Sequence, residues 1–196
     1  TVQSHLRALR DVSDVANAGS GKVVHEVVTD GSVYFGANTD PGNTDETVKF
    51  PSAVALTWRW TGDRRFLDDL YGFTKRNLDY VAAHLTPVRW PEGAGNVERA
   101  GQGPQKVDNA VYWIRGLTDE IEMATAEGDH AEVAKDQARL ARVLPRFEPD
   151  WWFGGTNPGS PTAGRADSYA DSRSDPGGVR IYQRYWTGVT PMEAQP

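Results

Sequence analysis

The stretch TGDRRFLDDLYGFTKRNLDYVAAHL, Thr61 to Leu85, decides the fold predicted from this sequence. Its apolar residues recur at helical spacing, so they share one face of a helix that starts near Arg64. They are Phe66, Leu67, Leu70, Phe73, Leu78 and Val81. Gly62 and Asp63, just before that helix, make a connecting turn. Because the pattern from Thr44 to Trp60 is also helical, the sequence predicts a helical hairpin.

The same unit recurs further along the chain. A second hairpin begins with the helical pattern from Lys106 to Ala126, and the turn EGD, Glu127 to Asp129, leads to its second helix, from His130 to Arg146. The repeated unit is therefore a pair of helices. The sequence predicts a mainly α fold.

The segments outside the hairpins have other patterns. Thr1 to about Val15 predicts an amphipathic helix, and Asp30-Gly31 is the dipeptide of a tight turn between two short strands. Pro51 is expected in the first turn of its helix or at a kink. Two long segments rich in Gly, Pro and Trp, residues 86–105 and 148–179, are predicted to be ordered loops with a function. Residues 18–43 are expected to join them at the substrate face.

The composition indicates a globular protein with uncharged partners. The chain has 196 residues and a formal net charge of -6. It contains no stretch rich in Lys and Arg that would replace the counterions of a phosphate backbone, which argues against nucleic acid. Seven Trp, seven Tyr and six Phe, several beside Gly and Pro, predict aromatic rings displayed on loops, where sugar faces stack.

The sequence leaves the compartment open. No apolar run approaches the roughly twenty residues that a membrane helix needs, so no membrane partner is expected. No charged-then-apolar leader is present in the given chain. The absence of Cys excludes disulfides and thiol catalysis, but it fits a secreted and a cytoplasmic bacterial protein equally well.

Two stretches resemble a known enzyme family. NTDETVKFPSAVALTWRWTGDRRFLDDLYGFTKRNLDYV, Asn43 to Val81, is similar to the segment of glycogen-debranching and glucoamylase-like enzymes in which Asn-Thr and an acidic residue open a helix that ends in Thr-Gly-Asp. RWPEGAGNVERAGQGPQKVDNAVYWIRGL, Arg89 to Leu117, is similar to their next hairpin, where a Trp-x-acid turn precedes a Lys-x-acid stretch. The similarity covers about Val23 to Gly128.

The resemblance implies the six-hairpin (α/α)6 toroid of glycoside hydrolases, with residues 1–196 as part of one catalytic domain. Six hairpins at this spacing need about twice the length of this chain, so we expect an incomplete toroid. Its partner would be the remaining half, from the same chain or from another subunit. Half a ring would leave inner-face residues such as Phe73, Val111 and Ile114 uncovered.

The same fold predicts where the loops lie. We expect the segments Asp40 to Glu46, Trp90 to Gln105 and Trp151 to Ala170 to meet at one end of the helices, on the substrate face. The turns at Gly62 and Gly128 should meet at the other end.

Inverting hydrolysis of a glycosidic bond needs a carboxylic acid that protonates the leaving oxygen and a carboxylate that activates water. Glu92 follows Trp90 and Pro91, whose turn and ring would desolvate a carboxyl, and the resemblance gives it the Trp-x-acid position. It is the candidate general acid, with an exposed loop glutamate as the alternative. Glu98 is the second candidate, although Arg99 beside it is consistent with a structural ion pair. The general base is expected outside this chain.

Asp45 and Glu46 open the helix that follows Thr44. A carboxylate there can cap amide donors and interact with the helix dipole without any further function. Carboxylates also accept hydrogen bonds from sugar hydroxyls, and the resemblance implies that Glu46, together with Asp45, binds the sugar in the innermost subsite. Because two adjacent like charges resist joint burial, one of them should point to solvent.

Lys106 and Asp108 start the next hairpin, where the resembled family places substrate-contacting residues. A purely N-terminal charge is the alternative for Asp108. Sugar-stacking platforms are expected on loops, at Trp90, Trp151 and Trp152. Tryptophans at helical positions are expected in the core, at Trp58, Trp60 and Trp113.

No metal site and no cofactor are predicted. The histidines are isolated and no pair has the spacing of metal ligands on a helix; they are His5, His25, His84 and His130. A calcium-binding loop is not predicted, because the stretch DPGNTDE lacks the Asp-x-Asp-x-Asn-Gly ligand spacing and the distal Glu. A phosphate-binding loop is not predicted either, because the stretch GAGNVERAGQG does not end in Gly-Lys-Ser/Thr.

Together with the resemblance, these observations predict a glycoside hydrolase that cleaves an α-linked glucan or a similar oligosaccharide with inversion of the anomeric configuration. The portion of the toroid in this chain is expected to be inactive alone. The alternative is a non-catalytic carbohydrate-binding fragment or scaffold. A polysaccharide lyase on a related toroid is disfavoured, because the loops contain little of the His that lyases use for proton abstraction.

Overall fold

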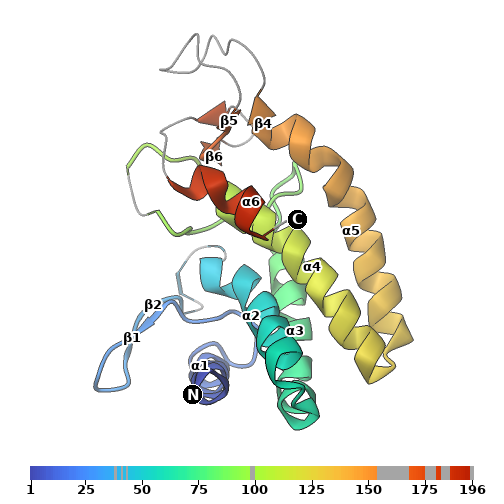
Figure 1. The fold of residues 1–196 in the computed structure, drawn as a ribbon. Helices are drawn as coiled ribbons and strands as arrows, with labels where there is room; N and C mark the ends of the chain where they lie inside the picture. The colour runs from blue at the N-terminus through green and yellow to red at the C-terminus, as the bar shows by residue number, and fades with distance from the viewer. Residues whose placement is uncertain are drawn as a thin grey trace.

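The computed structural model describes residues 1–37, 39–40, 42, 44–97, 100–153, 168–174, 180–181 and 186–194. This part of the chain is mainly helical, with a few short antiparallel strands, which confirms the predicted mainly α fold with a small β excursion. Figure 1 shows the arrangement of the elements. None of the described helices is both long enough and apolar enough to cross a membrane.

Two helical hairpins form the body of the molecule. The first is α2 (Asp45–Thr61) with α3 (Arg64–Ala83), and the second is α4 (Val107–Glu127) with α5 (His130–Trp151). Both first helices end on a left-handed glycine, Gly62 with φ 64° and Gly128 with φ 73°. Glycine adopts this conformation without the steric cost that other residues incur.

The residue after each glycine starts the next helix. The Asp63 carboxylate accepts a hydrogen bond from the Phe66 amide at 3.2 Å, and the Asp129 carboxylate accepts one from the Glu132 amide at 3.1 Å. Each aspartate therefore satisfies an amide donor that the helix itself leaves open. The Gly-Asp pair thus stops one helix and starts the next, as the sequence predicts.

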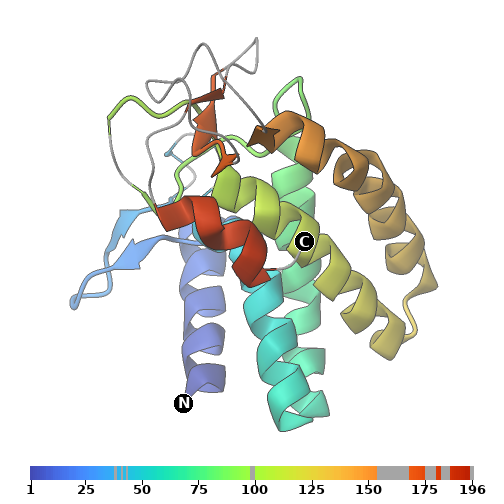
Figure 2. The ribbon, with the colours of Figure 1, turned by 45° about the horizontal axis from the view of Figure 1, so that its top comes forward.

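The hairpins pack side by side, with α4 against α2, α3 and α5 (Figure 2). Their turns lie together at one end. Arg64 donates to the Ala126 carbonyl at 2.7 Å, and Lys75 donates to the Asp129 carboxylate at 2.7 Å. This is the arrangement expected for the two turns.

The other elements surround the hairpins. Helix α1 (Val2–Ala16) contacts α2 and α3, and the hairpin of β1 (Glu26–Val27) and β2 (Val33–Phe35) projects beside it. Strands β3 (Gln105–Lys106), β6 (Ser172–Arg173) and β7 (Arg180–Ile181) form one sheet, and β4 (Trp152–Phe153) pairs with β5 (Ser168–Tyr169). The 3-10 helix η1 (Trp186–Val189) leads to α6 (Thr190–Ala194), and both contact α4.

Helix α5 extends further than the sequence predicts. It passes Pro145 and Pro149 and ends at Trp151, so the loop expected from residue 148 begins after the helix. Phe147 and Trp151 are 4% and 0% exposed. Burial of these two rings offsets the backbone hydrogen bonds that the prolines cannot donate. Pro51 likewise lies inside α2 rather than in its first turn, and it is buried.

The expected uncovered inner face is not present at the named residues. Phe73, Val111 and Ile114 are 2%, 0% and 0% exposed, because α1 to α5 and the loops already cover them. Trp113 is in the core as predicted. Trp60 is not: it lies in the last turn of α2 and is 83% exposed.

A buried glutamate lies between the hairpins, away from the loops. Glu120 on α4 is fully buried, and this burial raises its pKa well above the ordinary value. The charges of Asp136 and Glu132 on α5 raise the pKa further, while Thr74 and Lys75 on α3 lower it. Folding therefore favours the neutral form of this side chain.

We expect Glu120→Gln to stabilise the protein at pH 8 by about 1–3 kcal/mol, the scale of desolvating one polar group. A raised carboxyl pKa leaves stability intact below the unfolded-state pKa and reduces it as the pH rises towards the folded-state pKa. The wild-type and variant proteins should therefore have similar stability near pH 4 and diverge above it. Urea unfolding at several pH values measures the difference.

Glu122→Gln is the matched control on the same helix. Its hydrogen bond with Arg59 lowers the pKa of Glu122, so this variant should lose a little stability at neutral pH and not gain any. If Glu120→Gln followed the same course, the charge on Glu120 would not be destabilising.

Candidate functional site

The loops meet at the end of the helices opposite the two Gly-Asp turns (Figure 2). A Cβ placed at Gly42 would lie 2.8 Å from the Glu92 carbonyl oxygen, so the backbone at Gly42 lies close against that of Glu92 and Gly93. Glu92 forms a β-bridge with Gln105, and Gln105 in turn pairs with Arg173. The described parts of all three predicted loop segments therefore lie together.

A groove of about 310 Å³ opens at this meeting point. Its lining residues come from β2, the 36–44 loop and the segment before α4; they are Phe35, Gly42, Glu92, Gly93, Ala94, Pro104 and Lys106. Glu92 is exposed. Burial lowers the pKa of Lys106, while the charges of Asp108 and Glu92 oppose that change. The groove thus carries an acid and a base beside an aromatic ring.

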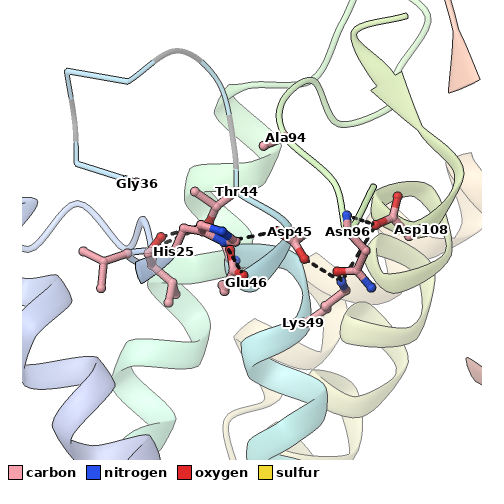
Figure 3. A network of polar contacts seen from close by, with 12 residues as sticks. His25, Gly36, Thr44, Asp45, Glu46, Lys49, Ala94, Asn96 and Asp108 are labelled. Atoms are coloured by element: carbon pink, nitrogen blue, oxygen red, sulfur yellow. Dashed lines mark hydrogen bonds and ion pairs between the residues drawn. The ribbon is translucent and has the colours of Figure 1, made fainter. Parts of the chain in front are cut away.

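A network of carboxylates lies next to the groove (Figure 3). Lys49 Nζ is 2.7 Å from Asp45 Oδ2 and 3.8 Å from the Asp108 carboxylate, and it also donates to Asn96. The Asn96 amide donates to Asp108 Oδ2 at 2.7 Å. Lys49 therefore connects the starts of α2 and α4, which carry Asp45 and Asp108.

The N-cap of α2 is a threonine, so the two acids that follow it are free of the capping role. Thr44 is the N-cap, and its hydroxyl accepts from the Thr47 amide at 3.2 Å. Asp45 and Glu46 are therefore not needed for capping. Asp45 is 4% exposed, whereas Glu46 is only half-buried and lies towards His25, whose Nδ1 is 2.7 Å from Glu46 Oε1. The expectation that one of the two acids points to solvent is wrong, because Glu46 turns to His25 and its Oε2 is buried.

The two helix starts hold carboxyls with raised pKa values. Burial, followed by the charge of Asp45, raises the pKa of Glu46 to about 7, although the His25 hydrogen bond opposes this change. Burial raises the pKa of Asp108 as well. A carboxyl with a pKa near 7 can be protonated or ionised at neutral pH, so this part of the site can exchange a proton.

The loop before α2 is held by a buried lysine. Lys22 is 1% exposed, and its Nζ donates to the carbonyls of Ala37 at 3.0 Å and Asp40 at 2.7 Å. The Asp40 carboxylate accepts from the Gly36 and Ala37 amides. Asp40 therefore stabilises its own loop, whereas Asp45 binds Lys49 in the carboxylate network.

Two of the predicted stacking platforms are corrected by the structure. Trp90 and Trp151 are 1% and 0% exposed and pack edge to face, with ring centroids 5.8 Å apart. Trp90 Nε1 donates to Asp150 at 2.8 Å. Neither ring is open to a sugar, because the end of α5 covers the turn at Trp90. Trp152 remains 36% exposed beside Tyr169.

The remaining predicted residues fall into three groups: those that line the groove, those in the carboxylate network, and one outside the described residues. Lys106 and Glu92 line the groove, and Asp45, Glu46 and Asp108 belong to the neighbouring network. Glu98, the second candidate acid, lies outside the described residues.

Sequence reasoning did not identify His25, Lys49 and Asn96 as site residues. Lys49 is four residues after Asp45 on a helix, a spacing that indicates an ion pair. His25 and Asn96 come from separate loops, and no local pattern marks them. Comparison of the sequence with protein-family models and with curated proteins gave no match. The function is therefore argued from the site.

Proposed function

We propose that this chain belongs to a glycoside hydrolase that cleaves an α-linked glucan or a similar oligosaccharide with inversion of the anomeric configuration. The observation that carries the proposal is the groove with Glu92 and Lys106 on its wall, next to the carboxylates of Asp45 and Asp108. Hydroxyl-rich ligands are recognised by such convergent acceptors and donors. The resemblance described above favours the same class.

In this proposal Glu92 is the general acid. It is exposed in the groove, so its carboxyl can reach a leaving-group oxygen. Glu46, whose side chain is 24% exposed, accepts hydrogen bonds from sugar hydroxyls, and Lys106 donates one. Asp45 and Asp108, which the sequence also predicts to contact sugar, are 4% and 2% exposed, so they hold Lys49 in place instead of meeting the ligand. The general base comes from the remaining part of the toroid, outside this chain.

The aromatic surface that contacts the sugar is smaller than the sequence predicts. Trp90 and Trp151 are in the core, so the predicted platform that remains exposed is Trp152, beside Tyr169, and Phe35 is the ring that lines the groove. An aromatic ring that is partly open can pack against a pyranose face. We therefore assign stacking to Phe35 and Trp152.

A hydrolysis screen of α- and β-linked oligosaccharides with the complete gene product tests the proposal. We expect release of a reducing sugar with inverted anomeric configuration from an α-linked substrate, detected by NMR immediately after cleavage. Retention of configuration would contradict the inverting mechanism. Saturable oligosaccharide binding without hydrolysis would favour a binding module, and release of an unsaturated uronate product would favour a lyase.

A further inference from the structure

We propose that His25, Asp45 and Glu46 form a binding site for one divalent transition-metal ion, with Zn²⁺ as its test ligand. His25 precedes β1, whereas the two acids start α2, and the fold brings them together (Figure 3). One ligand atom from each residue lies within 4.8 Å of the others. This inference goes beyond the proposed function and does not depend on it.

The distances are close to those of a tetrahedral site. Ligand atoms that lie about 2.0–2.2 Å from a metal at tetrahedral angles are about 3.3–3.6 Å apart. His25 Nδ1 is 2.7 Å from Glu46 Oε1 and 3.9 Å from Asp45 Oδ1. The first separation is about 0.6–0.9 Å too short and the second about 0.3–0.6 Å too long, which side-chain rotations can correct.

Two carboxylate oxygens at this point face each other without a nearby N–H or O–H donor among the described residues. Asp45 Oδ1 and Glu46 Oε2 are buried atoms that accept no hydrogen bond within the described part of the chain. The Asp45 side chain is 5% exposed, and its other oxygen is already bound to Lys49. Buried acceptors are normally satisfied by a donor or an ion. A metal bound by Asp45 Oδ1 and by both oxygens of Glu46 would satisfy Asp45 Oδ1 and Glu46 Oε2 together.

The charges also favour a cation. Lys49 is placed between Asp45 and Asp108, so its single positive charge is shared by two carboxylates. Glu46 adds a third carboxylate, and the three acids with Lys49 and Lys106, which also faces Asp108, leave one negative charge when all are ionised. A bound cation therefore meets a net negative site.

The donor set selects the kind of metal. One imidazole nitrogen with carboxylate oxygens suits Zn²⁺ and neighbouring first-row ions, whereas Ca²⁺ and Mg²⁺ prefer oxygen ligands alone. His25 and Glu46 are 28% and 24% exposed, so the ion can enter from solvent. Three protein ligands leave a fourth position for water or for a sugar hydroxyl.

Calorimetric titration of the full chain with ZnCl₂, without sugar, tests the site. We expect one saturable equivalent, and His25→Ala and Asp45→Asn should each weaken binding by at least about tenfold. His5→Ala is the matched control, because His5 is exposed on α1 and should not alter the affinity. Absence of saturable binding, or equal affinity of His25→Ala and wild type, would overturn the proposal.

X-ray absorption of the zinc-loaded wild type provides a second test that does not depend on the folding of a variant. The expected first shell has one imidazole nitrogen and oxygen ligands at about 2.0–2.2 Å. A shell with two or more imidazoles, or with none, would show that zinc binds elsewhere.

Discussion

Replacing Glu92 with Gln is expected to reduce turnover of an unactivated oligosaccharide by about 10²–10⁴-fold in the complete enzyme, the range for loss of a general acid. Glutamine keeps the size and hydrogen bonding of the side chain but cannot donate the proton. Steady-state kinetics on the same substrate should show the loss in kcat, with KM changed little.

Activated aryl glycosides provide the control for that result. Their leaving groups need little protonation, so Glu92→Gln should retain much more activity on them than on the oligosaccharide. Glu46→Gln is the matched variant, and it should mainly raise KM because it removes a ground-state contact with the sugar. If Glu46→Gln lost turnover and Glu92→Gln kept it, Glu46 would be the acid and the assignment made above would be wrong.

The second large effect concerns Gly21, in the segment that leads from α1 to His25. Its φ is 91°, and a Cβ there would lie 2.2 Å from the Arg76 carbonyl oxygen. Its own carbonyl accepts from Asn77 Nδ2 at 2.7 Å, which fixes the segment against α3. Gly21→Ala should therefore cost about 2–5 kcal/mol, from the left-handed backbone together with the clash.

Gly19→Ala separates the two causes. Gly19 has φ 70°, but a Cβ there would meet nothing within 4 Å. Only the backbone cost of about 1–2 kcal/mol should remain. Thermal unfolding of both variants measures the difference, and each kcal/mol corresponds to roughly 2–4 °C at this chain length. Equal melting temperatures would show that Arg76 moves away at little cost.

The helical hairpins were predictable because their signals are local. Gly62 and Asp63 are adjacent, and the apolar residues of α3 repeat at helical spacing, so a short window contains both the turn and the helix. The end of α5 was not predictable in this way. Pro149 indicates a helix end, but burial of Trp151 in the core depends on distant residues and outweighs that local signal.

The candidate site was predictable in part. Asp45 and Asp108 are each in the first turn of a helix, and both the helix start and the acidic residue can be recognised from the local sequence. The contact between His25 and Glu46 could not be predicted, because it joins a loop to a helix across 21 positions with no periodic pattern. Trp90 was misplaced for a related reason: a Gly/Pro-rich loop indicates exposure, but its ring packs under α5.

The pairing of β3 with β6 has a consequence for the order of folding. The α2–α3 and α4–α5 hairpins join neighbouring segments and need only short loop closures, so they can form early. Gln105 opposite Arg173 joins segments far apart in sequence, and closing that loop costs more entropy. Lys106, which lines the groove, belongs to this late pair. In a refolding experiment, helical circular dichroism should therefore recover before the groove can bind a ligand, and the delay between the two signals would measure closure of the β3–β6 pair.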